Sequence, residues 1–269
     1  MRQRIITAVI LAVLLLTSIV YLPTSLLLLG LGLLFLGGFW EWAGFAGHKF
    51  GLRRLPFVGT GLLGLAATYV YIFEMGGSPL PILVAAALWW VIALLWVMRY
   101  PTPVPGYVVR AAAFVVLIPA WLGLALLVSR ETLGGLWLLS AFFLVWAADT
   151  GAYFCGKAFG RHKLAPSVSP GKTWEGVVGG VVLAVIVAVV LALQLGIDPV
   201  VFGAVAVPIA LASVVGDLIV SLFKRNAGLK DSGRLFPGHG GILDRIDSVC
   251  AAAPLLALGL ILAGLKAAT

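Results

Sequence analysis

Residues 177–223, VVGGVVLAVIVAVVLALQLGIDPVVFGAVAVPIALASVVGDLIVSLF, decide the fold class of this chain. The stretch holds two apolar runs, 177–195 and 200–223, which are joined by a short Gly-Ile-Asp-Pro link. About 20 predominantly apolar residues in a helix are enough to cross the hydrocarbon core of a bilayer. The pattern therefore predicts two consecutive membrane-spanning helices.

The composition extends this conclusion to the whole chain. Hydrophobic residues make up 62% of the 269 residues, charged residues make up 10%, and the mean hydropathy is +1.14. Soluble domains are about half apolar and about a quarter charged. We therefore expect an all-α, polytopic integral membrane protein that forms a single domain. The net charge of +8 does not indicate a nucleic-acid partner, because the basic residues flank the apolar runs.

Nine apolar runs have the length of a membrane span. They are residues 5–22, 24–46, 56–74, 80–98, 111–128, 136–157, 177–195, 200–223 and 246–265. We expect the first run to be a retained helix, because it lacks the cleavage site of a secretory signal. If the N-terminus is cytoplasmic, every Lys and Arg except Arg130 and Lys266 lies on the inner side. This agrees with the positive-inside rule and places the C-terminus on the outer side.

One short segment, residues 221–247, is crowded with charge: SLFKRNAGLKDSGRLFPGHGGILDRID. Charged groups near a bilayer are costly and usually functional. Carboxylates suit a hard cation, lysines and arginines suit phosphate oxygens, and glycines let the backbone approach a ligand. We therefore expect metal-assisted chemistry on a phosphate. The candidate substrate-binding residues of this segment are Arg225, Lys230, Asp231, His239, Gly240, Gly241 and Arg245.

Three aspartates are the candidate metal ligands. Asp217 shares a helical stripe with Ser221 and Lys224, at spacings of four and three residues. Asp244 and Asp247 follow at i and i+3 on the start of the last helix. Mg²⁺ commonly takes one or two carboxylates together with substrate phosphates. Two or three carboxylates that converge on one cavity would therefore suit Mg²⁺, and the candidates are Asp217, Asp244 and Asp247.

Two upstream segments are expected on the same side of the membrane. Asp149 and Tyr153 share one face of the helix predicted over 136–157, where Asp149 either lines a polar cavity or forms an internal salt bridge. The loop 161–176, RHKLAPSVSPGKTWEG, is kept out of helix by its prolines. It brings Ser169 and Lys172 to a helix N-terminus, which favours anions. A structural helix cap by Thr173 is the alternative.

Four further residues have simpler interpretations. Gly176 and Gly180 form a small-xxx-small pair that predicts a close helix–helix contact. Cys155 and Cys250 are expected to be small core residues rather than nucleophiles. His239 could bind phosphate, act as an acid or bond to a loop carbonyl, and these options stay open.

The segment Ser221–Asp247 resembles the signature of the phosphatidate cytidylyltransferase (CDP-diacylglycerol synthase) family. The Lys-Arg, Lys-Asp, His-Gly-Gly and Asp-Arg-x-Asp elements of that signature are all met. The stretch 149–176, DTGAYFCGKAFGRHKLAPSVSPGKTWEG, is also similar to the family. The resemblance is specific over residues 145–250 and rests on hydropathy alone over 1–140. We therefore expect residues 1–140 to be mainly scaffold and residues 141–269 to carry the catalytic cavity.

The resemblance implies a reaction in which CTP and phosphatidate give CDP-diacylglycerol and pyrophosphate. It implies Mg²⁺ as cofactor, with Asp217 and Asp244 as the metal ligands, Asp247 next in order and Lys224 as a catalytic cation. It also allows a second cation such as K⁺. It places the protein in the bacterial cytoplasmic (inner) membrane, with the active site facing the cytoplasm, and it suggests a homodimer. Lys172, Lys224, Arg225, Lys230 and Arg245 would then hold phosphates of CTP or lipid.

Three alternatives remain from the residues. A related CTP-dependent enzyme could act on an isoprenoid or ether lipid. A cation-coupled transporter would also place Asp149 and Asp217 inside the membrane, but it would be expected to carry matching polar breaks in both halves of the chain. A structural scaffold would not need the Lys-Asp and His-Gly-Gly loops.

Overall fold

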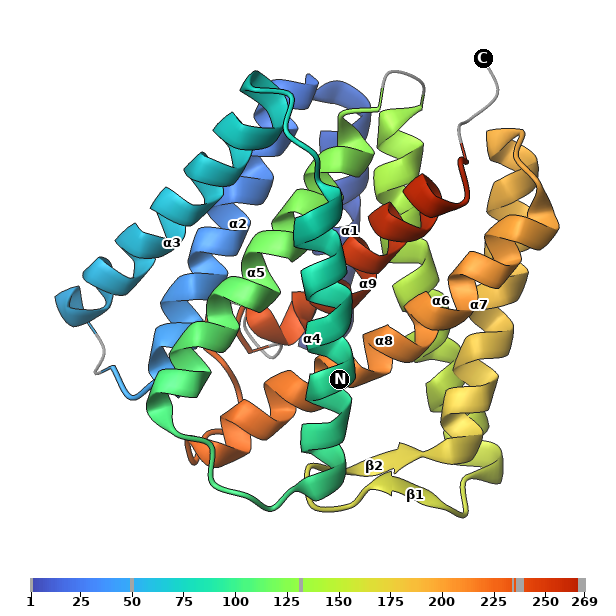
Figure 1. Cartoon of the computed structure of the whole chain (residues 1–269). Helices are drawn as coiled ribbons and strands as arrows, with labels where there is room; N and C mark the ends of the chain where they lie inside the picture. Colours follow the sequence, from blue (N-terminus) through green and yellow to red (C-terminus); the bar gives the residue numbers. More distant parts are fainter. Residues whose placement is uncertain (1, 49–50, 131–132, 234, 236–239, 266–269) are drawn as a thin grey trace.

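The computed structural model describes residues 2–48, 51–130, 133–233, 235 and 240–265. Nine α-helices make up most of these residues (Figure 1). They are α1 (Arg2–Tyr21), α2 (Thr24–Phe45), α3 (Leu55–Tyr69), α4 (Leu80–Arg99), α5 (Gly106–Val128), α6 (Gly134–Phe159), α7 (Trp174–Leu195), α8 (Pro199–Asn226) and α9 (Leu243–Leu262). Two strands, β1 (Lys163–Ala165) and β2 (Ser169–Thr173), lie between α6 and α7.

The prediction of an all-α, polytopic membrane protein is confirmed. Within the described residues, eight helices are long and apolar enough to cross a membrane, and these are α2 to α9, with the span of α3 extending over Leu52–Glu74. The apolar part of α1, Val9–Tyr21, is shorter, so a ninth crossing and the orientation of the termini stay predictions.

The helices begin and end close to the expected positions. The largest difference is at α5, which begins at Gly106 rather than at 111, about one turn earlier. Arg110 was taken as a boundary, but it is an exposed residue inside the helix. A long basic side chain near a helix end can keep its charge in water while its stem covers apolar surface, so the charge does not end the helix.

Helices α5 and α9 form the centre of the bundle. In their most apolar stretches, 72% of the α5 residues and 67% of the α9 residues are buried inside the protein. The two helices meet at Gly123, where an added Cβ would lie 2.6 Å from the carbonyl oxygen of Ala253. Helix α8 crosses the bundle obliquely, and α9 begins near the middle of the molecule (Figure 1). The start of α9 is therefore surrounded by protein.

A second close contact joins α6 to α7, as the glycine spacing predicted. A Cβ on Gly180 would lie 2.6 Å from the carbonyl oxygen of Ala148, and a Cβ on Gly176 would lie 2.8 Å from that of Ala152. Small residues at such crossings let two helix backbones approach each other. The contact fixes the distance between α6 and α7, which form two walls of the site described below.

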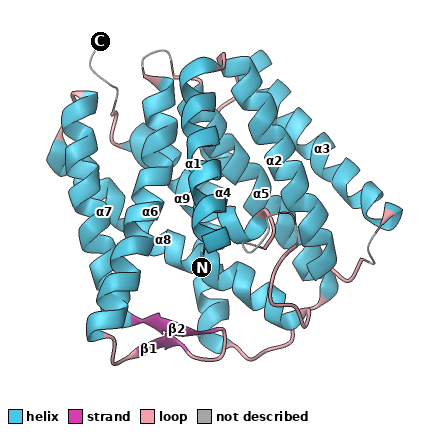
Figure 2. Ribbon diagram, turned by 180° about the vertical axis from the view of Figure 1, so that it is seen from behind, coloured by secondary structure: helices cyan, strands magenta, loops and turns pink. Residues whose placement is uncertain are grey.

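The strands β1 and β2 form a small antiparallel hairpin at one end of the bundle (Figure 2). Lys163 pairs with Thr173 and Ala165 pairs with Ser169. The sequence analysis correctly kept this segment out of helix but did not foresee the pairing. The Oγ1 atom of Thr173 accepts a hydrogen bond of 3.1 Å from the backbone N–H of Gly176, so Thr173 caps α7. The hairpin is thereby held against the start of α7.

Candidate active site

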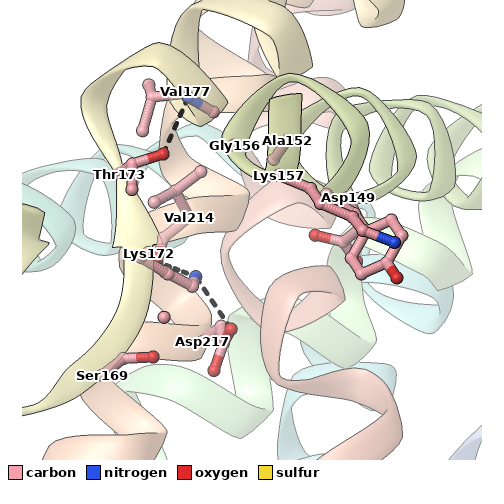
Figure 3. A pocket seen from close by; sticks show the side chains of 13 residues that line it. Asp149, Ala152, Gly156, Lys157, Ser169, Lys172, Thr173, Val177, Val214 and Asp217 are labelled. Atoms are coloured by element: carbon pink, nitrogen blue, oxygen red, sulfur yellow. Dashed lines mark hydrogen bonds and ion pairs between the residues drawn. The ribbon is translucent and has the colours of Figure 1, made fainter. Parts of the chain in front are cut away.

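A cavity of about 470 Å³ opens beside the hairpin (Figure 3). Its walls are α6, β2, the first turn of α7 and the middle of α8. The lining residues are Asp149, Ala152, Tyr153, Gly156, Lys157, Ser169, Gly171, Lys172, Thr173, Gly176, Val177, Val214 and Asp217. The volume lies within the usual range of about 300–1,000 Å³ for small-molecule sites. Five residues predicted to form the site, Asp149, Tyr153, Ser169, Lys172 and Asp217, therefore meet here.

An ion pair occupies the α8 wall of the cavity. The Nζ atom of Lys172 lies 2.8 Å from Oδ2 of Asp217 and donates a longer bond of 3.3 Å to the carbonyl oxygen of Val214. The other carboxylate oxygen of Asp217 accepts a hydrogen bond of 3.1 Å from Ser221 Oγ. The side chains of Lys172 and Asp217 are 23% and 32% exposed. The pair is therefore accessible to a ligand in the cavity.

The α6 wall contributes a carboxylate, a phenol and an amine. Asp149 lies within electrostatic range of both Lys172 and Asp217. The Nζ atom of Lys157 lies 5.9 Å from the centre of the Tyr153 ring. The cavity therefore presents cationic groups on two walls. Glu175 does not join it, because its carboxylate binds the ring of His162 at 2.7 Å on another side of α7.

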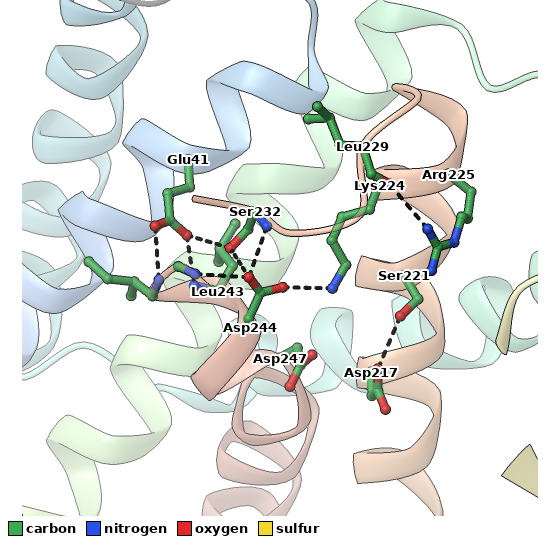
Figure 4. A network of polar contacts seen from close by, with 12 residues as sticks. Glu41, Asp217, Ser221, Lys224, Arg225, Leu229, Ser232, Leu243, Asp244 and Asp247 are labelled. Carbon is green, nitrogen blue, oxygen red and sulfur yellow. Dashed lines mark hydrogen bonds and ion pairs between the residues drawn. The ribbon is translucent and has the colours of Figure 1, made fainter. Parts of the chain in front are cut away.

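A second cluster of polar contacts surrounds Asp244 at the start of α9 (Figure 4). Its Oδ1 atom binds Lys224 Nζ at 2.7 Å, and both side chains are about nine-tenths buried. Its Oδ2 atom accepts hydrogen bonds from the backbone N–H groups of Ser232 (2.8 Å) and Gly241 (2.9 Å) and lies 2.9 Å from Ser232 Oγ. Asp244 thus ties α8 and the loop after it to the start of α9.

Asp247 lies one turn further along α9, next to Asp217 of α8 (Figure 4). Its Oδ1 atom accepts a 2.8 Å hydrogen bond from the N–H of Ser248. No described cation forms an ion pair with it, although Lys224 and Lys172 attract it at longer range and Asp217 repels it. Lys224 also attracts Asp217. The cavity and the Asp244 cluster are therefore electrostatically connected.

The carboxylates fit a magnesium ion in number and chemistry. No three His, Cys, Asp or Glu side chains of the described residues lie close enough together to hold a metal by themselves. Mg²⁺ needs fewer, because it usually keeps one or two carboxylates and takes its other ligands from water and substrate phosphate. Asp217 and Asp247 are neighbouring like charges, and a cation between them would remove their repulsion. Asp244 Oδ1 is engaged by Lys224 in this structure.

The other predicted substrate-binding residues lie outside the cavity lining. Arg225, Lys230, Asp231 and Arg245 are exposed around the end of α8 and the start of α9. Gly240 has a positive φ of 79°, which favours glycine. The N–H of Gly241 is bound to Asp244. His239 lies outside the described residues.

The sequence analysis missed one acidic residue of this region, Glu41. It belongs to α2, is 6% exposed, and accepts hydrogen bonds from Ser232 Oγ and from the N–H groups of Ile242 and Leu243. The signal for Glu41 was a carboxylate inside the apolar run 24–46, which is as costly there as Asp149 and Asp217 are in their own runs.

Comparison with known proteins identifies the family of this chain. A model of the cytidylyltransferase family matches residues 2–262. The chain is 43% identical to a phosphatidate cytidylyltransferase of Pseudomonas aeruginosa over 98% of both chains. It is 39% identical to one of Haemophilus influenzae over 94% of this chain and 96% of the relative. It is 44% identical to one of Staphylococcus aureus over 56% of this chain and 59% of the relative. The chain thus belongs to the cytidylyltransferase family.

Proposed function

We propose that this protein transfers the cytidylyl group of CTP to phosphatidate, producing CDP-diacylglycerol and pyrophosphate. Family membership and the names of its full-length relatives support this activity. The observation that carries it in the structure is the wall of the cavity, where Lys172 and Asp217 form an accessible ion pair with Asp149 in range. Such a site offers positive charge to phosphates and carboxylates to a metal.

The reaction joins two anions, so charge neutralisation is its main requirement. A phosphate oxygen of phosphatidate attacks the α-phosphorus of CTP, and the bond from that phosphorus to the bridging β-phosphate oxygen breaks. Preorganised positive groups and positioning supply much of the catalysis in such transfers. A phosphate dianion carries its own nucleophilic oxygen, so the proposal assigns no general base.

Lys172 pairs with Asp217, and Lys224 pairs with Asp244. We infer that each lysine exchanges its carboxylate for a phosphate oxygen when substrate binds. Through this exchange each lysine keeps a negatively charged partner when substrate binds, and one oxygen of Asp217 and one of Asp244 become available. Arg225, Lys230 and Arg245 lie exposed beside this region and are proposed to attract the polyphosphate.

Asp217 and Asp247 are the proposed magnesium ligands, and Asp244 would join them once Lys224 releases its Oδ1 atom. Bound magnesium would neutralise phosphate charge and act as a Lewis acid on the transferred group. Asp149 is proposed to complete the polar wall or to orient a second cation, for which K⁺ is a candidate. Tyr153, Ser169 and the backbone near Gly240 and Gly241 are proposed to contact substrate.

The proposed orientation places the hairpin end of the bundle in the cytoplasm of a bacterial cell. Helices α2, α4, α6 and α8 all end toward this side of the molecule (Figure 1), where the basic residues Arg99, Lys157 and Lys172 lie. A homodimer is also proposed, from the family resemblance alone. The small-residue face at Gly176 and Gly180 packs inside the chain and is not available for a partner.

The test is transfer of label from α-labelled CTP into the lipid phase. Purified protein is supplied with phosphatidate and Mg²⁺, and then assayed with excess chelator. We expect labelled CDP-diacylglycerol only with the metal, and poor use of ATP or dTTP. Transfer that persists in chelator would contradict the magnesium proposal, and absence of any labelled lipid would contradict the activity.

The alternatives have less support. A transporter would be expected to carry matching polar breaks in both halves of the chain. The N-terminal half does hold a buried acid, Glu41, but its carboxylate bonds to the loop and helix of the C-terminal half. Glu41 therefore belongs to the same polar region and does not form a second, matching one. A CTP enzyme for isoprenoid or ether lipids is separated from the main proposal by offering those lipids in the same assay.

A further inference from the structure

Glu41 is a buried acid of α2, and within the described residues its hydrogen bonds all go to the start of α9 and the loop before it. Its Oε1 atom accepts from the N–H of Ile242 (2.8 Å), and its Oε2 atom accepts from the N–H of Leu243 (2.9 Å) and from Ser232 Oγ (2.7 Å). The side chain therefore reaches from α2 to the start of α9 and to the loop before it (Figure 4).

The start of α9 needs such a partner. The first N–H groups of any helix have no acceptor within the helix, and α9 begins inside the bundle rather than at its surface (Figure 1). The residue before α9 is Ile242, which has no polar side chain and makes no cap. A carboxylate at this end also interacts favourably with the helix dipole. Glu41 thus performs from α2 the capping that α9 cannot provide for itself.

Two glycines of the charged segment are explained by the same carboxylate. A Cβ on Gly233 or on Gly241 would collide with Glu41 Oε1. On the α2 side, a Cβ on Gly37 would collide with Ile242, and one on Gly38 would lie 3.3 Å from Leu243. Glycines on both partners therefore let the loop and the start of α9 lie directly against α2.

Ser232 connects Glu41 to the proposed metal site. Its Oγ atom lies 2.7 Å from Glu41 Oε2 and 2.9 Å from Asp244 Oδ2. Its backbone N–H also binds Asp244. The orientation of Asp244 is therefore set by a loop residue that Glu41 holds, and the chain runs from α2 through Ser232 to Asp244 and Lys224.

We propose that Glu41 is a positioning residue for the transfer reaction, acting through Ser232 and the α9 start to aim Asp244. This inference rests on the proposed function, in which Asp217, Asp247 and Asp244 hold magnesium. It makes α2 part of the catalytic apparatus, whereas the sequence predicted mainly scaffold over residues 1–140. Glu41 itself touches neither the cavity nor the carboxylates of Asp217 and Asp247 in the described contacts.

The test compares Glu41→Gln, which keeps the shape and removes the charge, with Leu31→Ala. Leu31 is also buried in α2 but lies about 15 Å along the helix from Glu41, at 1.5 Å per residue. For each purified variant, we would measure the thermal midpoint, the Mg²⁺ concentration giving half-maximal transfer, and hydrogen exchange at amides 241–243 without substrate.

In Glu41→Gln, we expect faster exchange at amides 241–243, and a half-maximal Mg²⁺ concentration raised about 10- to 100-fold, as for other partners that orient metal ligands. In Leu31→Ala, we expect a lower thermal midpoint but an unchanged Mg²⁺ dependence. Ser232→Ala should raise the half-maximal Mg²⁺ concentration less than Glu41→Gln does. In the double variant, Ser232→Ala should add a smaller increase than it causes in the wild-type protein. It also serves as the test if Glu41→Gln does not fold.

Two results would overturn the inference. The first is a wild-type Mg²⁺ dependence in Glu41→Gln or, if that variant does not fold, in Ser232→Ala. The second is a shift of the half-maximal Mg²⁺ concentration in Leu31→Ala that is as large as the shift in Glu41→Gln. If the wild-type protein makes no CDP-diacylglycerol, the proposed function fails instead. The exchange measurement then still decides whether Glu41 holds the start of α9, because it needs neither substrate nor metal.

Discussion

At the scale of single residues, the two aspartates of the Asp244-Arg-Ile-Asp247 sequence have opposite surroundings. Asp244 accepts hydrogen bonds from Lys224, Ser232 and Gly241, so it supports the loop as well as the proposed metal. Asp247 accepts a bond from its own neighbour, Ser248, and is repelled by Asp217. Two aspartates that lie three residues apart on one helix therefore differ. Asp244 is anchored by hydrogen bonds, whereas Asp247 is available to a cation.

This difference predicts opposite effects on stability. Asp244→Asn should abolish transfer and lower the free energy of unfolding by about 1–3 kcal/mol, because it leaves buried polar groups unsatisfied. Asp247→Asn should also abolish transfer but leave the thermal midpoint unchanged or higher, because it removes repulsion from Asp217. Thermal unfolding in detergent and the label-transfer assay measure both quantities. An active Asp247→Asn enzyme would remove Asp247 from the metal site.

Lys172 provides a second prediction at this scale. Lys172→Met removes the positive charge nearest to Asp217, so we expect a raised KM for CTP or phosphatidate and a lower kcat. Lys163→Met is the matched control, because Lys163 is an exposed lysine of the same hairpin that lies outside the cavity lining. That control removes the same charge and should leave both KM and kcat unchanged. Equal kinetic defects in the two variants would contradict a phosphate-binding role for Lys172.

At the scale of elements, the α6–α7 crossing sets the width of the cavity. Gly180 lies against the backbone of Ala148, one residue before Asp149, so a larger residue at 180 must push α6 and α7 apart. We expect Gly180→Val to lower both the thermal midpoint and the rate of transfer. Gly59→Ala in α3 is the control, because nothing lies within 4 Å of the added Cβ. It should leave both unchanged or raise the midpoint.

The hairpin and the cap of α7 act together with this crossing. Thr173 Oγ1 binds the N–H of Gly176, and Gly176 itself packs against Ala152 of α6. Lys172 is therefore placed by β2, by a helix cap and by a helix crossing at once. Rigid elements hold a functional side chain more closely than a free loop does, which explains how a lysine in a non-helical segment can face an aspartate of α8.

At the scale of the whole molecule, the basic residues predict the orientation in the membrane. A cysteine-free background with Lys230→Cys should react with a membrane-impermeant maleimide only in inside-out vesicles. Glu74→Cys, at the proposed outer end of the span Leu52–Glu74, should react only in right-side-out cells or vesicles. Both positions are exposed in the structure. Labelling of both from the same side would overturn the nine-span topology.

The amino-acid sequence by itself determined the fold class and the approximate positions of the helices, and it indicated a candidate region for the chemistry. Each membrane helix satisfies its own backbone hydrogen bonds, and its apolar side chains can face lipid as well as protein, so a span can be recognised without its neighbours. The charged segment 221–247 was also recognisable from the sequence, because its composition contrasts with the surrounding apolar chain.

The tertiary structure alone decided which charges pair. Lys172 binds Asp217, and Lys224 binds Asp244, although the sequence allowed either lysine to face either acid. Glu41 meets Ser232 across a separation of 191 residues. Such pairings depend on how helices cross, and the crossing is set by packing between surfaces that are distant in sequence. Local patterns carry no information about that packing, which is why the proposed positioning role of Glu41 in α2 became visible only in the folded protein.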